Sequence, residues 1–285
     1  MVYQWYPGHM TRARREMEEN IRLIDLVIEL VDARMPLSSR NPDIDALGRG
    51  KARLILLNKA DLADAAANQE WCRWFEAQGM FALPIDARIN AGRKAIQEKV
   101  ALACQEKKER DRRRGIRNRP VRAMVAGIPN VGKSTFINSY AKRAVARTGN
   151  KPGVTKGKQW IRLGGDLELL DTPGILWPKF EDQAVGRKLA FIGSLNDEIL
   201  VREELAVELI AFLQDAYPEA LAARYQTEGK EAADLLLQIG ENRKCYKKGG
   251  EVDLDKAAGI LLEDFRSGRL GRITLERPQK GRDIS

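Results

Sequence analysis

The sequence predicts an α/β domain with a mostly parallel sheet, followed by a small helical domain. Between residues 26 and 171, short apolar segments alternate with polar segments of helical character, which is the pattern of strand–helix–strand units around a parallel sheet. A glycine-rich turn, Gly127–Ser134, joins one apolar segment to a helix. After about residue 183 the apolar residues recur only at helical spacing. These observations predict a first domain at residues 1–182 and a second at 183–285.

Six strands are expected in the first domain, because each is a short apolar run that ends in a turn or a polar motif. The last two are separated by Gly164 and Gly165, which favours a hairpin. Helices are expected over residues 65–78, over residues 93–114 and directly after Ser134. The predicted strands are Leu26–Ala33, Arg53–Leu57, Ala82–Ile85, Val121–Ala126, Gln159–Leu163 and Leu167–Leu170.

The second domain is expected to be helical, because its apolar residues fall on one face at spacings of three and four. The two clearest sets are Leu205, Leu209, Phe212 and Leu213, and Leu254, Ala258, Leu261, Leu262 and Phe265.

The composition argues against a membrane or secreted protein. The longest apolar stretch, Leu23–Val31, is interrupted by Asp25 and Glu29 and is too short and too charged to cross a bilayer. The N-terminus lacks the apolar core of a signal peptide. The three cysteines are scattered and form no C-x-x-C pair, which indicates neither a disulfide framework nor a zinc site. We therefore expect a reducing, cytoplasmic location and no membrane partner.

The net charge of +9 is concentrated in two stretches. Residues 104–122 carry nine Lys and Arg against three acids, and residues 141–162 carry seven against none. The remainder of the chain is net acidic. Local basic stretches favour contact with a polyanion, most often nucleic acid. A solvated helix face or a linker is the alternative interpretation of either stretch alone.

The segment Gly127–Ser134 matches the phosphate-binding pattern G-x-x-x-x-G-K-[ST] at every position. It follows an apolar strand and opens a helix, which is the context of a P-loop. Its amides are expected to face the phosphates, with Lys133 on the β- and γ-phosphates and the Ser134 hydroxyl on Mg²⁺. The predicted phosphate-side residues are Asn130, Val131, Gly132, Lys133, Ser134 and Thr135.

The tetrapeptide Asn58–Asp61 predicts guanine rather than adenine as the base. A carboxylate at Asp61 accepts hydrogen bonds from the guanine N1–H and 2-amino group, and adenine offers neither donor at these positions. The loss of such partners costs orders of magnitude in affinity. We therefore predict base contacts by Asn58, Lys59 and Asp61, with the Ala87 amide as a further candidate for guanine O6.

Two further motifs complete a magnesium-dependent GTP site. Asp171–Gly174 (Asp-Thr-Pro-Gly) follows the sixth strand. Asp171 is expected to hold Mg²⁺ through water, and the Gly174 amide to contact the γ-phosphate. Thr155 is the expected second hydroxyl ligand of Mg²⁺. A Ras-like GTPase begins with its P-loop, whereas here N-K-x-D comes first, which predicts a circularly permuted Ras-like P-loop GTPase domain.

With this motif order, the sequence resembles the circularly permuted GTPases of ribosome assembly. The resemblance implies GTP hydrolysis late in the assembly of the large (50S) subunit, stimulation by that particle, and an RNA-contacting C-terminal domain. The loop Ile85–Ala87 departs from the more usual Ser-Ala, so Asp86 is not assigned as a direct base contact. The shared segments are Trp5–Met10, Asp32–Pro42, Asn58–Asp61, Gly127–Ser134, Pro152–Thr155 and Asp171–Gly174.

Hydrolysis requires a group that aligns the attacking water. The position of the Ras glutamine after D-x-x-G holds Ile175, which cannot align water. His9 is the only histidine of the chain; from the residues alone it is either catalytic or packed on nearby aromatic rings, and the resemblance implies that it replaces the glutamine. Asn130 is either a simple turn residue or, as in related GTPases, a ligand for K⁺.

The sequence thus predicts an enzyme that binds GTP and GDP and hydrolyses GTP with Mg²⁺. Its expected partner is the large ribosomal subunit, through rRNA and ribosomal proteins, and the chain is expected to be a monomer. A GTP-dependent switch that acts on a protein partner is the alternative. A P-loop kinase or ATPase is disfavoured by Asp61.

Overall fold

The computed structural model describes residues 18–89, 92–116, 119–141, 159–162, 167–171, 183–195 and 201–278. The chain divides into two compact units, residues 1–181 together with 274–285, and residues 182–273. Within the described ranges, no helix combines the length and the apolar character needed to cross a membrane.

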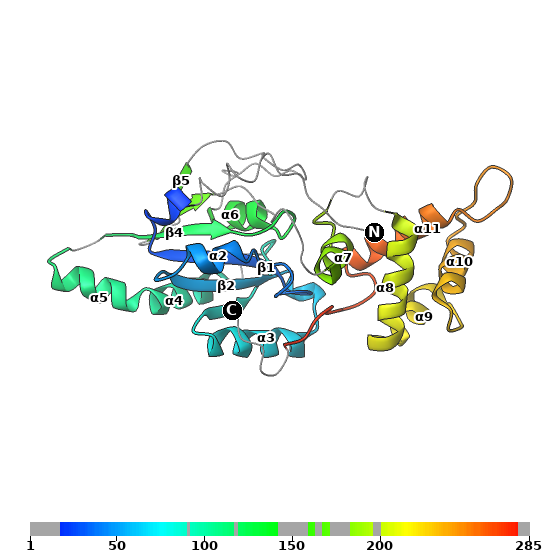
Figure 1. Cartoon of the computed structure of the whole chain (residues 1–285), viewed down its shortest axis with the longest axis horizontal. Helices are drawn as coiled ribbons and strands as arrows, with labels where there is room; N and C mark the ends of the chain where they lie inside the picture. The colour runs from blue at the N-terminus through cyan, green and yellow to red at the C-terminus, as the bar shows by residue number, and fades with distance from the viewer. Residues whose placement is uncertain are drawn as a thin grey trace. The chain divides into compact units, whose positions relative to one another are not determined.

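A six-stranded sheet forms the centre of the described part of the first unit, in the order β3-β2-β1-β4-β6-β5 (Figure 1). Neighbouring strands are parallel except β5 and β6, which are antiparallel. The predicted mostly parallel sheet is confirmed, and β1 is buried along its whole length, as is usual for a central parallel strand. The strands are Leu26–Asp32 (β1), Ala52–Asn58 (β2), Phe81–Pro84 (β3), Val121–Ala126 (β4), Gln159–Arg162 (β5) and Leu167–Asp171 (β6).

Helices connect these strands. The helix α3 packs Trp71 and Phe75 into one buried cluster with Ile55 and Leu57 of β2. Asp64 caps the start of this helix, because its carboxylate accepts hydrogen bonds from the amides of Ala66 and Ala67. The helices of this unit with both ends described include Asp43–Leu47 (α2), Ala65–Ala77 (α3), Arg93–Ala103 (α4), Gln105–Arg113 (α5) and Lys133–Ala141 (α6), with a 3₁₀ turn at Ala60–Leu62.

The single helix predicted over residues 93–114 is two helices, α4 and α5. They meet at Cys104, which is buried and whose φ of −105° and ψ of 13° are not helical. Ile96 and Val100 bury one face of α4, whereas α5 buries no residue. Figure 1 shows α5 continuing from α4 beyond the sheet. The reason is that the apolar positions stop at Cys104, so α5 has no face to pack on the strands.

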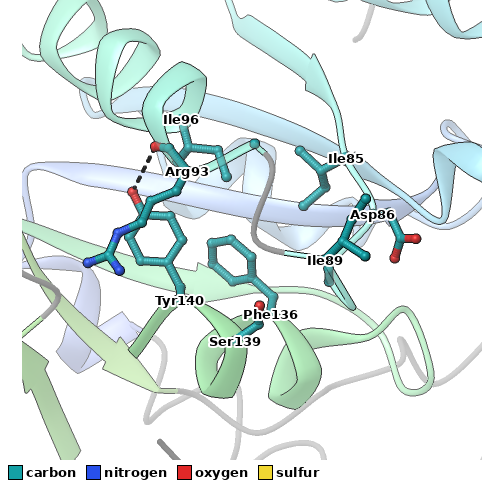
Figure 2. A pocket seen from close by; sticks show the side chains of 10 residues that line it. Ile85, Asp86, Ile89, Arg93, Ile96, Phe136, Ser139 and Tyr140 are labelled. Carbon is teal, nitrogen blue, oxygen red and sulfur yellow. Dashed lines mark hydrogen bonds between the residues drawn. The ribbon is translucent and has the colours of Figure 1, made fainter. Parts of the chain in front are cut away.

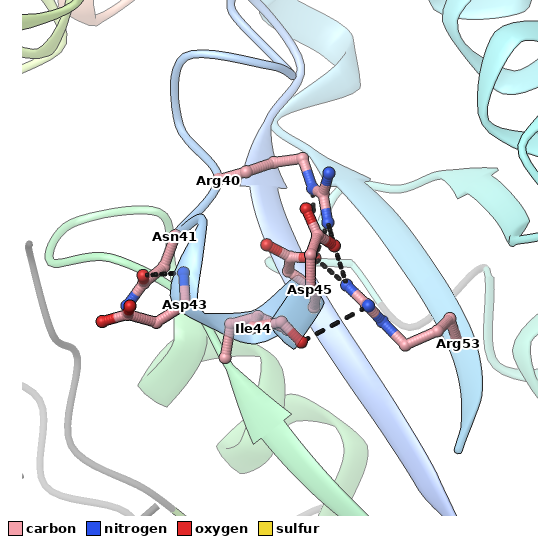
Figure 3. Close-up of polar contacts among 7 residues, drawn as sticks. Arg40, Asn41, Asp43, Ile44, Asp45 and Arg53 are labelled. Atoms are coloured by element: carbon pink, nitrogen blue, oxygen red, sulfur yellow. Dashed lines mark hydrogen bonds and ion pairs between the residues drawn. The ribbon is translucent and has the colours of Figure 1, made fainter. Parts of the chain in front are cut away.

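A buried network of charges ties β1 to the segment that follows it. Glu29, in the middle of β1, is 1% exposed and accepts hydrogen bonds from Arg40 Nη2 at 3.0 Å and Arg53 Nη2 at 2.9 Å. Asp45 of α2 bonds to the same two guanidinium groups (Figure 3). Two acids and two arginines therefore balance, and this compensates for the burial of the Glu29 charge.

We expect Arg40→Ala to lower the free energy of unfolding by about 3–5 kcal/mol, because the buried Glu29 carboxylate would lose half of its compensation. Urea unfolding followed by tryptophan fluorescence reports on the first unit, since all five tryptophans lie within residues 1–181. The control is Lys94→Ala, because the Lys94–Glu98 pair is exposed and 4.0 Å long. A destabilisation by Arg40→Ala no larger than that of the control, about 1 kcal/mol or less, would argue against the network.

The second unit is helical in its described residues, as predicted (Figure 1). The helices α8, α10 and α11 contact one another and bury apolar faces that include Leu209, Ile239 and Leu261. Of the apolar residues that the sequence places at helical spacing here, Phe212 and Leu254 are only partly buried. The helices are Gln183–Phe191 (α7), Arg202–Ala216 (α8), Glu219–Tyr225 (α9), Ala232–Asn242 (α10) and Leu254–Arg266 (α11).

The last described residues return to the first unit, which differs from the predicted second domain of 183–285. The Leu275 N–H donates to the Arg34 carbonyl at 2.6 Å. The Glu276 carboxylate accepts hydrogen bonds from the amides of Leu37 and Ser38 at 2.5 and 2.8 Å. Residues 274–278 therefore hold the segment that follows β1, and they belong with the sheet rather than with the helical unit.

Candidate guanine nucleotide site

The P-loop segment Gly127–Ser134 runs from the end of β4 into the first turn of α6, as its motif predicts. Two of its glycines stand where a side chain has no room. A Cβ on Gly127 would lie 2.8 Å from the Leu30 carbonyl oxygen, and one on Gly132 would lie 2.3 Å from Asn58 Nδ2. Gly132 also has a φ of +94°, a conformation that favours glycine. A tight glycine loop before a helix N-terminus is suited to binding an anion.

The side chains at the start of α6 are arranged for this role. Lys133 is the first residue of the helix and is 8% exposed, so its ammonium is held against the protein rather than extended into water. Ser134 and Thr135 are partly exposed. Hydroxyls that remain accessible at a helix N-terminus are suited to a metal-bound nucleotide.

Asn58, at the end of β2, is hydrogen-bonded to two other loops, the P-loop and the loop that contains Ala87. Its Nδ2 donates to the Val131 carbonyl of the P-loop at 2.6 Å. Its Oδ1 accepts from the Ala87 amide at 2.9 Å. The Ala87 amide, predicted from the sequence to face guanine O6, thus donates to the protein in this structure. The predicted phosphate and base motifs nevertheless meet at one side chain.

Lys59 makes a second link between the same motifs. It has a left-handed backbone, with φ of 60°, and its Nζ donates to the Asn130 carbonyl at 2.8 Å and to Asp32 Oδ2 at 2.9 Å. Asp32 is fully buried and also bonds to Arg34. Burial alone would raise the pKa of Asp32, but the charges of Arg34 and Lys59 hold it well below its ordinary range.

Asp32 has a role that the motifs alone did not identify. It is the last residue of β1, beside Asn58 in the parallel register, and it fixes the lysine of the N-K-x-D motif. The position of Asp32 in the sequence could have marked it as a site residue. It is a carboxylate at the carboxyl end of a buried strand, which is where ligands bind in such sheets.

Asp61 and Asp86 share one cation. Arg88 Nη2 lies 2.6 Å from Asp61 Oδ2 and 2.8 Å from Asp86 Oδ2. The hydrogen bond from Arg88 is the main reason that the pKa of Asp86 lies below its ordinary value. Arg88 is not among the site residues predicted from the sequence, although it directly follows the Ile85–Ala87 loop.

A mainly apolar pocket is lined on one side by the Ile85–Ala87 loop and on another by α6. Figure 2 shows Phe136 of α6 lying between Ile85, Ile89 and Ile96. The Tyr140 hydroxyl of α6 donates to the Arg93 carbonyl at 3.4 Å. The helix that begins at the P-loop thus lines one pocket together with the loop that carries Asp86.

Several predicted site residues lie outside the described residues: His9, Thr155, Gly174 and Ile175. For Asp171 the backbone is described, and it pairs with Val125 in the parallel register of β6 and β4. The D-x-x-G motif therefore begins beside the strand that leads into the P-loop.

No group of three or more His, Cys, Asp or Glu side chains that could hold a metal ion occurs in the part of the chain that the structure describes. A magnesium–nucleotide site does not depend on such a group, because phosphate oxygens, hydroxyls and water supply most of the ligands. The residues present fit a nucleotide. Gly127 and Gly132 of the P-loop stand where a Cβ atom would clash, as in a tight phosphate-binding loop. Asp61 Oδ1 is buried without a hydrogen-bond partner in the described structure, so it can accept a bond from a base.

Comparisons with known proteins indicate the family to which the chain belongs. A family model described as "50S ribosome-binding GTPase" matches residues 122–246. Ribosome biogenesis GTPase A of Bacillus cereus is 48% identical over 98% of this chain and 95% of its own length. The protein of the same name from Thermotoga maritima is 31% identical over 96% of this chain and 94% of its own length.

Solved structures lead to the same conclusion. The GDP-bound structure of Thermotoga maritima YlqF covers 93% of this chain and 99% of that chain, with a TM-score of 0.67 and 27% identity. The family-model match begins in β4, so the N-K-x-D motif at residues 58–61 precedes the matched segment. The chain therefore belongs to the ribosome biogenesis GTPase A family, and it is a GTPase with a circularly permuted G domain.

Proposed function

We propose that this GTPase acts in a late step of large ribosomal subunit assembly and that the particle stimulates its GTP hydrolysis. The name of the relatives and the description of the family model support this partner. The structural observation that carries the proposal is α5, which has no buried residue and carries exposed arginines at positions 110, 112 and 113. A basic helix that contributes nothing to the core is suited to RNA phosphates.

Some cations of the basic stretch at residues 104–122 are paired with acids in the structure and are therefore less available to RNA. Lys107 pairs with Asp111 at 2.8 Å, and Arg122 pairs with Glu168 at 3.3 Å. These cations balance acids of the same unit. The proposed RNA surface is therefore the outward arginines of α5, and the paired positions are left out of it.

A second basic surface, which was not predicted from the sequence, lies in the second unit. It is the basic hairpin, residues 243–252, closed by the pairing of Tyr246 with Val252. Tyr246 is 48% exposed, and an exposed ring among cations is suited to stacking on an unpaired base. The cations, within six residues that contain no acid, are Arg243, Lys244, Lys247 and Lys248.

Binding to purified large subunits over a range of salt concentrations tests both surfaces. We expect the α5 triple variant R110E/R112E/R113E and the hairpin variant K247E/K248E to bind more weakly. The slope of log affinity against log salt should become shallower by about 0.7–0.9 for each phosphate that the variant no longer neutralises. Lys94→Glu, at a highly exposed position of α4, is the control. Salt-independent binding that neither variant weakens would favour the alternative, a switch acting on a protein partner.

For the chemistry, we assign Mg²⁺ to the hydroxyls of Ser134 and Thr155 and, through water, to Asp171. His9 aligns the attacking water in place of the missing glutamine. Asn130 has a left-handed backbone, with φ of 64°, and is the proposed K⁺ ligand of the P-loop. A K⁺ ion there would supply positive charge to the transition state, so turnover should be faster in K⁺ than in Na⁺ buffer. Equal rates in the two buffers would remove this ion from the proposal.

A further inference from the structure

The two oxygens of the Asp61 carboxylate have different surroundings. Oδ2 accepts a hydrogen bond from Arg88 Nη2 at 2.6 Å. Oδ1 is buried and has no hydrogen-bond partner within the described structure. A buried acceptor without a donor is costly, and it is satisfied at once if a ligand brings an N–H group. The carboxylate is thus held through one oxygen, while the acceptor capacity of the other is unused in the described structure.

Asp86 explains why a cation is needed at this place. Its carboxylate is 13% exposed and accepts from the Arg88 amide at 2.9 Å, from Nε at 3.0 Å and from Nη2 at 2.8 Å. Arg88 therefore bridges Asp86 to Asp61. Without the bridge, two negative carboxylates would face one site and repel each other.

The exposure of Arg88 indicates that its geometry is not forced by packing. Its side chain is 65% exposed, and an exposed ion pair alone contributes little stability. Arg88 nevertheless donates to Asp86 from both Nε and Nη2, and Nη2 also donates to Asp61. A carboxylate oxygen accepts two hydrogen bonds, so Arg88 and a guanine donor can use Asp61 together without competing.

We infer that Arg88 is a positioning residue for guanine recognition, which cancels the charge of Asp86 and orients Asp61 toward the N1–H and 2-amino groups of the base. This rests on the proposed role of Asp61. Asp86 occupies the loop position where the more usual sequence has a serine; a serine hydroxyl could donate to Asp61, but an ionised aspartate cannot. In this chain the arginine two residues later supplies the missing donor.

The test compares GDP with IDP, which differs from GDP only by the absence of the 2-amino group. We expect Arg88→Ala to weaken GDP binding about tenfold, the effect of one charge-assisted hydrogen bond, and to weaken IDP binding less. The ratio of GDP to IDP affinity therefore falls. Arg88→Lys, which keeps the charge, should restore part of the ratio. The double variant D86N/R88A should restore part of the affinity, because it removes the uncompensated carboxylate.

The variant Asp61→Asn distinguishes a failure of the proposed Arg88 role from a failure of the proposed base site. If Asp61→Asn changes GDP binding and Arg88→Ala leaves the GDP-to-IDP ratio as in the wild type, the role of Arg88 is overturned while the base site stands. If Asp61→Asn changes neither nucleotide, the base site itself fails. A melting temperature measured for each variant identifies a purely structural effect: a less stable Arg88→Ala protein with an unchanged ratio also overturns the inference.

Discussion

Asp61→Asn is expected to weaken GDP binding by roughly 10²–10⁴-fold, because two charge-assisted hydrogen bonds to guanine are worth about 1.5–3 kcal/mol each. The same variant should gain affinity for xanthosine diphosphate, since the new amide N–H₂ donates to the xanthine O2 and its oxygen accepts from N1–H. Displacement of a fluorescent nucleotide measures both affinities in one assay.

The control for this change is Asp215→Asn, which makes the same substitution at an exposed position of α8. It should leave both affinities as in the wild type. GDP binding by Asp61→Asn that matches this control, with no gain for the xanthine nucleotide, would show that Asp61 does not face the base.

Gly132→Ala is expected to reduce nucleotide affinity by roughly 10- to 100-fold, because it breaks a buried hydrogen bond that shapes the P-loop, at a cost of about 1–3 kcal/mol. The new Cβ would lie 2.3 Å from Asn58 Nδ2, so Asn58 would have to give up its 2.6 Å hydrogen bond to the Val131 carbonyl. Calorimetric titration with GDP and with GTP measures the reduction. Both nucleotides should be affected equally, because the displaced loop contacts phosphates common to the two.

Gly79→Ala is the matched control, because Gly79 has a similar φ of +76° but no atom within 4 Å of the added Cβ. It carries the backbone strain without the clash, and it should cost about 1–2 kcal/mol of stability with normal GDP binding. If Gly132→Ala binds GDP as well as Gly79→Ala does, the close approach of Gly132 and Asn58 has no functional meaning.

The strands were the most predictable part of the fold, because each is an apolar run whose length matches one pass through a buried sheet. Leu26–Asp32 and Val121–Ala126 lie within one residue of their predicted bounds. Their neighbours in the sheet follow from the GTPase motifs, since the P-loop and N-K-x-D loops must meet at one edge. The antiparallel β5 and β6 also agree with the predicted hairpin.

The helix over residues 93–114 was predicted too long, because charged residues favour a helix locally whether or not it packs. Cys104 ends α4 at a buried position, and burial depends on tertiary contacts. The return of residues 274–278 to the first unit was not predictable for the same reason. Glu276 caps the Leu37 and Ser38 amides from more than 200 positions away in the sequence, and no local pattern marks such a contact.

Within the site, the motif residues were predictable and their supporting side chains were not. Asn58, Lys59 and the P-loop are brought together as the motifs require. Asp32 and Arg88 act on these residues through ion pairs, and an ion pair across loops leaves no spacing in a single sequence. The cations of residues 104–122 illustrate the converse, because a basic run does not reveal which of its members are neutralised by acids in the fold.

The measurement that tests the central claim most directly is GTP turnover with and without purified large ribosomal subunits, in the presence of Mg²⁺ and K⁺. Because Ile175 stands where a glutamine would align water, we expect slow turnover by the protein alone and strong stimulation by the particle. His9→Ala should bind GTP normally, and its stimulated turnover should fall by about 10²–10⁴-fold, the usual contribution of a positioned side chain in proton transfer. Turnover that is the same with and without large subunits would contradict the account.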